Sequence, residues 1–177
     1  SFNIPRPQDA AEVMLQEFEG KYCYLINTVV QKNERVKKLP ASIGLFWDAS
    51  FSGTIRKAEK ELELLDLYFK KIQNLGVTLV VFSNTIKSTK AFPVKNGNWD
   101  DLKKFIGSIQ YDGATDIGNL DLNNIKADEF ILVSDGRHTL GNKQMQLTGK
   151  RVYCVNSSSI ADYSNLKFIA SRTGGLL

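Results

Sequence analysis

Apolar residues in this chain form short continuous runs that alternate with longer stretches in which they recur every three or four positions. Continuous apolar runs predict strands that are buried on both faces, as in parallel sheets. The chain has four such runs: Ser42–Trp47, Val77–Ser83, Glu129–Ser134 and Arg151–Val155. Strands that alternate with helical segments predict an α/β fold, here a doubly wound, mostly parallel, Rossmann-like sheet with helices on both faces.

The longest helical pattern lies between the first two predicted strands. Apolar residues recur at spacings of three and four from Ile55 to Leu75, which predicts a helix of about six turns. Ser52 or Thr54 can cap its start, and Gly76 is expected to end it in the left-handed conformation. A long amphipathic helix should therefore follow the first strand.

The remaining elements of the domain are shorter. Ile86–Phe92 is more polar and precedes Pro93, which predicts an edge strand antiparallel to its neighbour. Asn98 is expected to cap the next helix. The predicted helices are Trp99–Ile106, a brief one near Ile117–Leu122, and one over Ile160–Ser171 that Gly174-Gly175 ends.

Residues 1–40 differ in pattern and are expected to form an N-terminal extension to a domain over residues 41–177. Residues 8–19 have weak helical character that Gly20 would end, and Tyr22–Val30 is dense in aromatic and β-branched residues, which predicts a strand. Asn33–Pro40 is charged and ends in proline, as a connector would. Leu176-Leu177 is typical of the start of one more strand, so we expect the polypeptide to continue past residue 177.

Composition indicates one ordinary globular domain of 177 residues, with 42% hydrophobic and 24% charged residues. No apolar stretch approaches the roughly 18 residues of a membrane span, so we expect no direct membrane insertion. The net charge is +4, but the positive residues are spread along the chain. The one basic run (Lys32, Arg35, Lys37 and Lys38) is interpreted as a solvated linker, and no nucleic-acid partner is expected. Cys23 and Cys154 lie in apolar runs and are expected to be small buried residues rather than a disulfide.

The strongest chemical signal is the pattern Asp48-Ala49-Ser50-Phe51-Ser52 at the end of the first strand. In α/β sheets, ligands bind in the crevice beyond the carboxyl ends of the strands. The pattern places a carboxylate and two hydroxyls there at alternate positions, so the two hydroxyls can point to the same side of the turn. Hard oxygen atoms suit Mg²⁺, Mn²⁺ or Ca²⁺ better than zinc or copper.

Two further segments join this pattern in the same order along the chain. One is the glycine-rich loop Gly113-Ala114-Thr115-Asp116-Ile117-Gly118, and the other is Leu132-Val133-Ser134-Asp135-Gly136 at the end of a predicted strand. Together the three segments resemble the metal-ion-dependent adhesion site of the von Willebrand factor A (vWA) domain, over about residues 41–177. The first 40 residues are compatible with the end of a VIT domain, which precedes vWA domains in larger bacterial proteins.

The resemblance implies a set of metal positions and a kind of partner. It assigns direct coordination of one divalent ion to Ser50, Ser52 and Thr115, and assigns Asp48 and Asp135 to the ion's bound waters. Neutral hydroxyls leave the ion able to take one external carboxylate. The implied function is a metal-dependent binding module, not an enzyme, that captures an acidic side chain of a partner protein. The implied setting is a larger bacterial envelope or surface protein.

The sequence departs from the family pattern at two positions of the first loop. Phe51 replaces a common glycine, and Gly53 replaces a common methionine. Phe51 is expected either to narrow access to the ion or to contact a partner. In addition, Asp112 and Asp116 are expected near Asp48 and Asp135, where the carboxylates would repel each other without a cation.

Two other classes of function compete with the binding module. A magnesium-dependent hydrolase or phosphotransferase could use Asp48 as a nucleophile, but such enzymes commonly carry a second aspartate at the position of Ser50. The single histidine, His138, lies close to Asp135 and is interpreted as incidental. A third reading is a structural domain in which the metal acts only as a staple. The sequence does not indicate an oligomeric state.

Overall fold

The computed structural model describes residues 12–28, 37–141 and 144–177. The chain divides into two compact units, Ser1–Lys38 and Leu39–Leu177. Part of the basic run, namely Lys32 and Arg35, lies outside the described residues, as do residues 8–11 of the predicted N-terminal helix.

The first unit contains a two-stranded antiparallel hairpin of β1 (Glu12–Phe18) and β2 (Lys21–Asn27). The predicted helix over residues 8–19 is therefore wrong from residue 12 on. The predicted strand Tyr22–Val30 is confirmed as far as Asn27, and its residues 29–30 lie outside the described ranges. The two turn residues, Glu19 and Gly20, have φ values of 50° and 70°, as a tight hairpin turn requires. The apolar residues of 12–18 suit either a helix or a strand, and pairing with β2 makes this segment a strand.

Side chains on both faces of this hairpin are exposed. Val13, Leu15, Tyr22 and Tyr24 are each more than half exposed. Cys23 is exposed as well, so the prediction of a buried thiol is wrong at this position. An apolar sequence run indicates burial only where a second layer covers it.

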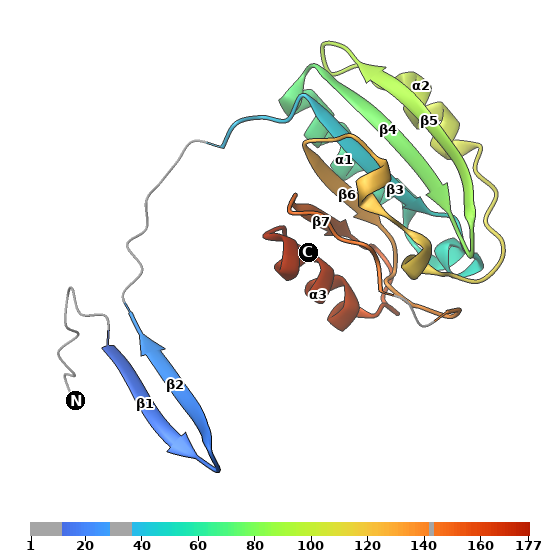
Figure 1. Cartoon of the computed structure of the whole chain (residues 1–177). Helices are drawn as coiled ribbons and strands as arrows, with labels where there is room; N and C mark the ends of the chain where they lie inside the picture. The colour runs from blue at the N-terminus through green and yellow to red at the C-terminus, as the bar shows by residue number, and fades with distance from the viewer. Residues whose placement is uncertain (1–11, 29–36, 142–143) are drawn as a thin grey trace, which may run out of the picture. The chain divides into compact units, whose positions relative to one another are not determined.

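The second unit is built on a five-stranded sheet in the order β5-β4-β3-β6-β7 (Figure 1). Its strands are β3 (Ser42–Asp48), β4 (Leu75–Phe82), β5 (Ile86–Val94), β6 (Glu129–Val133) and β7 (Val152–Val155). All neighbours are parallel except β4 and β5. The predicted α/β class and the antiparallel edge strand are confirmed.

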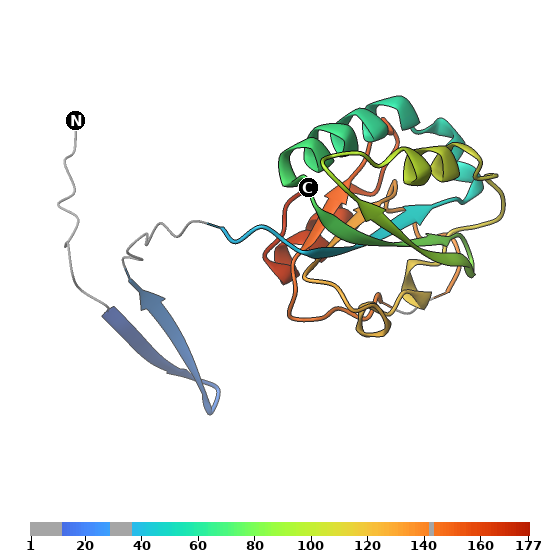
Figure 2. The same ribbon diagram turned by 90° about the horizontal axis from the view of Figure 1, so that it is seen from above.

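Helices cover both faces of this sheet, and Figure 2 shows α1 and α2 together on one side. On that side, α1 (Ala58–Ile72) and α2 (Asp100–Gly107) pack on alternate sheet residues such as Leu45 and Trp47. The other side is covered by α3 (Tyr163–Thr173) and by the short 3₁₀ helices η2 (Ile117–Asn119) and η3 (Leu122–Asn124), over Phe46 and Leu132. Successive residues of a buried strand thus belong to two separate cores.

The connection from β3 to β4 differs from the prediction of one six-turn helix. It consists of η1 (Phe51–Ile55) followed by α1, which has 15 residues. Gln73, with φ of 71°, follows the helix, and Gly76 lies within β4. Leu75 fits the helical spacing but is buried in the strand, because strand pairing outweighed its place in the helical pattern.

The residues predicted to begin and end the other helices are confirmed in part. The side chain of Asn98 accepts a hydrogen bond from the N–H of Asp100 at 3.0 Å, but Trp99 and not Asn98 is the residue that directly precedes α2, so the predicted cap is displaced by one position. Gly174 ends α3 in the left-handed conformation. Beyond it, the carbonyl of Leu176 accepts a hydrogen bond from the N–H of Cys154 in β7 (2.8 Å). Among the helices of the described ranges, none has the length and apolar character needed to cross a bilayer.

Candidate metal centre

Three loops meet where the parallel strands end, and backbone hydrogen bonds fix their mutual positions. The N–H of Phe51 donates to the carbonyl of Gly113 (2.9 Å), and the N–H of Asp112 donates to the carbonyl of Ala49 (3.0 Å). The N–H of Asp116 donates to the carbonyl of Ser83 at the end of β4 (3.0 Å). The loop after β3 and the glycine-rich loop are therefore held together without any side chain.

Asp48 is the last residue of β3 and is fully buried. One carboxylate oxygen, Oδ1, accepts a hydrogen bond from the N–H of Ser50 (2.9 Å), and Oδ2 accepts one from the hydroxyl of Ser134 (2.6 Å). Trp47 pairs with Val133, so parallel register places Asp48 beside Ser134. The fold thus anchors this carboxylate at both of its oxygens.

Ser50 and Ser52 present their hydroxyls to the same side of the turn, as their spacing predicts. The two Oγ atoms are 3.1 Å apart, and Ser50 is 1% exposed. Neither side chain caps a helix: η1 begins without a side-chain cap, and the hydroxyl of Thr54 donates to the carbonyl of Phe51. The predicted capping roles of Ser52 and Thr54 are therefore wrong, which leaves the serine hydroxyls available as ligands.

Thr115 and Asp135 are buried on the two adjoining loops. The backbone of Thr115 is bonded to Thr139, through its N–H (2.8 Å) and its carbonyl (3.0 Å). Asp135 accepts a hydrogen bond from the N–H of Arg137 (3.0 Å). The structure brings Asp48, Ser50 and Ser52 into direct contact, whereas no direct hydrogen bond joins Thr115 or Asp135 to that group. Asp116, not Thr115, caps the helix that follows.

The other two carboxylates of this segment, Asp112 and Asp116, each have partners away from Asp48. Asp112 is exposed and forms an ion pair with Lys87. Asp116 accepts hydrogen bonds from the N–H of Gly118 (3.0 Å) and from the side chain of Asn119 (2.8 Å). Of the four carboxylates expected to lie close together, only Asp48 and Asp135 are buried.

Sequence reasoning missed a buried ion pair beside the centre. Arg56 follows η1, and its side chain is 1% exposed. Its Nε lies 3.1 Å from Oε1 of Glu61, and its Nη2 donates to the carbonyl of Asp48 (2.8 Å). Arg56 and Glu61 are five positions apart and match no helical spacing, so the sequence carries no signal for this pair.

The residues at this edge have the chemistry that a divalent cation requires. The five predicted positions supply only carboxylate and hydroxyl oxygens, which Mg²⁺ and Ca²⁺ prefer. Among the described residues, no three His, Cys, Asp or Glu side chains form a metal-binding group, so a cation here would depend on the hydroxyls. The buried charges at this edge are Asp48, Asp135, Glu61 and Arg56, and they sum to −2. A dication would neutralise that charge.

The two departures from the family pattern have different structural settings. Phe51 is 70% exposed on the loop that carries the serines, so its ring faces solvent. Gly53 is buried beneath Tyr111: a Cβ atom at this position would lie 2.7 Å from a ring carbon of that tyrosine. A methionine cannot be accommodated here unless the tyrosine moves.

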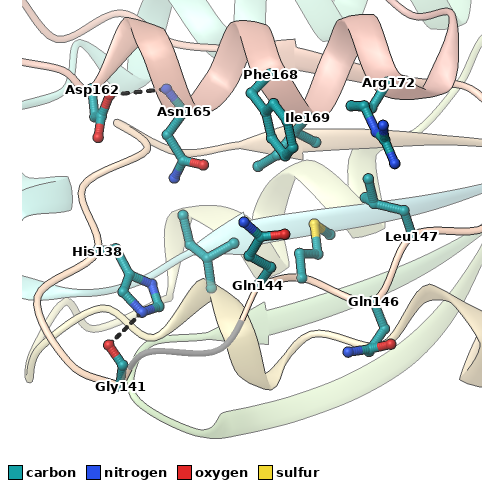
Figure 3. A pocket seen from close by; sticks show the side chains of 12 residues that line it. His138, Gly141, Gln144, Gln146, Leu147, Asp162, Asn165, Phe168, Ile169 and Arg172 are labelled. Atoms are coloured by element: carbon teal, nitrogen blue, oxygen red, sulfur yellow. Dashed lines mark hydrogen bonds between the residues drawn. The ribbon is translucent and has the colours of Figure 1, made fainter. Parts of the chain in front are cut away.

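A separate cavity of about 690 Å³ lies between α3 and residues 138, 141 and 144–147 (Figure 3). Phe168 and Ile169 of α3 contribute to its apolar lining, with Arg172 near one end and His138 near the other. Nε2 of His138 lies 2.9 Å from the carbonyl oxygen of Gly141. The residues that line the cavity include none of the five predicted metal positions.

Comparison with known proteins identifies solved structures that have a similar fold. No protein-family model and no curated protein matches the chain. An aerotolerance-related membrane protein from Bacteroides fragilis is 14% identical with a TM-score of 0.55, over 77% of this chain and 89% of that one. BatB from Bacteroides thetaiotaomicron is 14% identical with a TM-score of 0.56, over 77% and 88%. Proximal thread matrix protein 1 of the mussel byssus is 18% identical with a TM-score of 0.50, over 80% and 42%. The chain thus shares its α/β fold with these proteins.

Proposed function

We propose that this chain is a vWA-like binding module that captures an acidic side chain of a partner protein through a divalent cation. The cation is Mg²⁺, with Mn²⁺ or Ca²⁺ as substitutes, at a site formed by Asp48, Ser50, Ser52, Thr115 and Asp135. In this proposal the domain is a binding protein and not an enzyme.

The observation that carries the proposal is the group of Asp48, Ser50 and Ser52 at the carboxyl edge of the sheet. Their contacts bring hydroxyl and carboxylate oxygens together in a buried place whose net charge is −2. Burying such charge without a counterion is unfavourable, because each charge loses its hydration. A dication would satisfy both the oxygen ligands and the charge.

Each residue has a distinct part in the proposed capture. Ser50, Ser52 and Thr115 would offer neutral oxygens, while the carboxylates of Asp48 and Asp135 would hold bound water. A cation held mainly by neutral ligands supplies a free coordination position for a carboxylate oxygen of the partner. Phe51, which is exposed beside the serines, would cover an apolar side chain next to that carboxylate.

The rival reading as a phosphotransferase finds less support at this site. Oxygen atoms of Asp48 accept hydrogen bonds from the backbone of Ser50 and the hydroxyl of Ser134, which makes this carboxylate a poor nucleophile. Its neighbour two positions on is a serine, where such enzymes commonly have a second aspartate. His138 is bonded to the backbone of its own loop.

The direct test is calorimetric titration of the chelator-treated protein with Mg²⁺ and then Mn²⁺. Ser50→Ala is the matched variant, because it removes one hydroxyl and no charge, whereas Asp48→Ala would also change the buried charge and remove the acceptor of the Ser134 hydroxyl. We expect one-to-one binding that raises the melting temperature and that Ser50→Ala abolishes. Absence of binding to the unmodified protein would refute the proposed site.

A second titration separates adhesion from a structural staple. Peptides that contain one aspartate or one asparagine at the same position are added to the metal-loaded protein. A capture site binds only the aspartate peptide and loses it on chelation, whereas a staple binds neither peptide. Phe51→Ala should weaken peptide binding several-fold and leave metal affinity unchanged.

A further inference from the structure

Arg56 is a buried cation that contacts Asp48, one of the residues of the candidate metal centre. Its Nη2 donates to the main-chain carbonyl of Asp48, and its Nη1 lies 3.9 Å from Oδ2 of the same residue. On its other side, Nε contacts Glu61, whose Oε1 accepts a hydrogen bond from the hydroxyl of Ser157 (2.7 Å). The guanidinium therefore lies between two buried carboxylates.

Aromatic rings hold this guanidinium in place. Its central carbon lies 5.5 Å from the ring centre of Trp47 and 5.9 Å from that of Tyr111, distances at which a cation is attracted by an aromatic face. The indole N–H of Trp47 donates to the hydroxyl of Tyr111 (2.9 Å), which fixes the two rings relative to each other. Arg56 thus has a preformed position.

One atom of Arg56 has no hydrogen-bond partner in the described part of the chain. This atom is Nη1, which is buried and lies 3.9 Å from Oδ2 of Asp48. A buried donor without a partner is unfavourable, so hydrogen bonding does not explain its position. Electrostatic attraction explains this position, because Nη1 places positive charge near the carboxylate of Asp48.

The charge balance at this edge depends on Arg56. Asp48, Asp135 and Glu61 contribute −3, and Arg56 changes the sum to −2. The other buried acid among the described residues, Glu129, begins β6 at the opposite edge of the sheet. Lys87 and Asp112 pair with each other near the surface, and Arg137 and His138 are exposed. Arg56 is therefore the buried positive charge in this group.

We propose that Arg56 determines the ion specificity of the centre, by setting its charge to match a dication rather than a trivalent ion. It acts through the field at the site and through the position of Asp48, without contacting the ion. This inference rests on the proposed metal site and adds to it a residue outside the family's metal positions.

The test varies charge at fixed shape and compares two ions of closely similar radius, Ca²⁺ and Tb³⁺. Arg56→Gln changes the buried charge to −3, Glu61→Gln changes it to −1, and the double variant restores −2. The measured quantity is the ratio of Tb³⁺ affinity to Ca²⁺ affinity, from terbium luminescence and competition by calcium. One unit of charge several ångströms away, at an effective dielectric constant of about 20, changes this ratio by roughly tenfold or more.

We expect the ratio to rise about tenfold in Arg56→Gln, to fall about tenfold in Glu61→Gln, and to return within about threefold of the unmodified value in the double variant. Arg56→Lys should keep the unmodified ratio, because it preserves charge. Structural damage alone would not move the two single variants in opposite directions. If the ratio of Tb³⁺ to Ca²⁺ affinity is unchanged in Arg56→Gln and Glu61→Gln, or shifts in the same direction in both, the proposed role of Arg56 is wrong.

Two controls keep the outcome decisive. Circular dichroism and thermal unfolding establish that each variant folds; if Arg56→Gln does not fold, Glu61→Gln and Arg56→Lys test the same charge rule with opposite and null expectations. If the unmodified protein binds no dication, the proposed function and this inference both fail. If it binds a dication and the ratio is insensitive to charge, only this inference fails.

Discussion

Replacement of Gly53 by alanine should destabilise the domain through Tyr111. Gly53 is buried, and a Cβ atom there would lie 2.7 Å and 2.9 Å from two ring carbons of that tyrosine. Real Cβ atoms do not approach other atoms so closely, so the ring must move. Its movement would break the 2.9 Å hydrogen bond from the indole N–H of Trp47, and Trp47 is fully buried.

The expected loss of stability follows from these two effects. Overpacking typically costs about 1–3 kcal/mol, and a buried donor left unpaired costs about 1–3 kcal/mol. Because one movement causes both, we expect a combined loss of roughly 2–4 kcal/mol rather than the full sum. In a domain of this size that corresponds to a fall in melting temperature of about 5–15 °C.

Urea and thermal unfolding of Gly53→Ala measure this loss directly. Gly107→Ala is the matched control, since Gly107 ends α2 and nothing lies within 4 Å of a Cβ atom there; it should leave stability within about 1 kcal/mol of the unmodified value. In a Tyr111→Ala background the same Gly53→Ala change should cost much less. If Gly53→Ala were as stable as the unmodified protein, the ring of Tyr111 would not be fixed by packing, and the explanation for the missing methionine would fail.

Three further predictions concern other parts of the chain. Gly136→Ala should cost about 2–4 kcal/mol in urea unfolding, because φ is 72° and its Cβ would lie 2.6 Å from a leucine of α3; Gly174→Ala, with φ of 71° and open space, should cost only about 1 kcal/mol. Burial raises the pKa of the Cys154 thiol to about 12, so alkylation of the folded protein at pH 8 should modify the exposed Cys23 and not Cys154, and comparable rates would contradict this. Backbone N–H groups at the start of β3 lower the pKa of Asp128. The stability it contributes is therefore present above its unfolded pKa of about 3.9 and lost as pH falls through the lower folded value. Asp128→Asn should thus be less stable at pH 7, and a difference from the unmodified protein that persisted at acid pH would refute this.

Much of the fold could be predicted because its strands are buried on both faces. The apolar runs of β3, β4 and β6 are too short for a typical helix, which favours buried strands, and the more polar segment before Pro93 indicated the antiparallel edge. The two errors in element boundaries or type occurred where two patterns overlap. Leu75 fits both a helix and a strand, and residues 12–18 carry apolar residues that suit either structure. In both places, pairing with a neighbouring strand decided the outcome, and a sequence pattern does not contain that partner.

The candidate centre was predictable to the extent that it follows one strand end. Asp48, Ser50 and Ser52 are close in sequence and contact each other in the structure. The sequence indicated Thr115 and Asp135 only through the family resemblance, because their loops reach this edge by tertiary folding. The hydrogen bond from Ser134 to Asp48 depends on strand register. Arg56 could not be predicted at all, since its contacts come from a turn, a helix and two aromatic rings.

The segment after α3 bears on how this sheet avoids aggregation. Strand β7 ends the sheet, and unpaired N–H groups of an edge strand are a template for foreign strands. Here the carbonyl of Leu176 accepts the N–H of Cys154, and Gly175 lies so close to β7 that a Cβ atom would meet the carbonyl oxygen of Val152 at 1.9 Å. At the opposite edge, β5 carries Pro93 and lysines. Both edge strands are thus protected against pairing with another sheet. At β7 the protection comes from Gly175, which lets the chain after α3 approach the strand closely. At β5 it comes from the charge of the lysines and from Pro93, which has no N–H to donate.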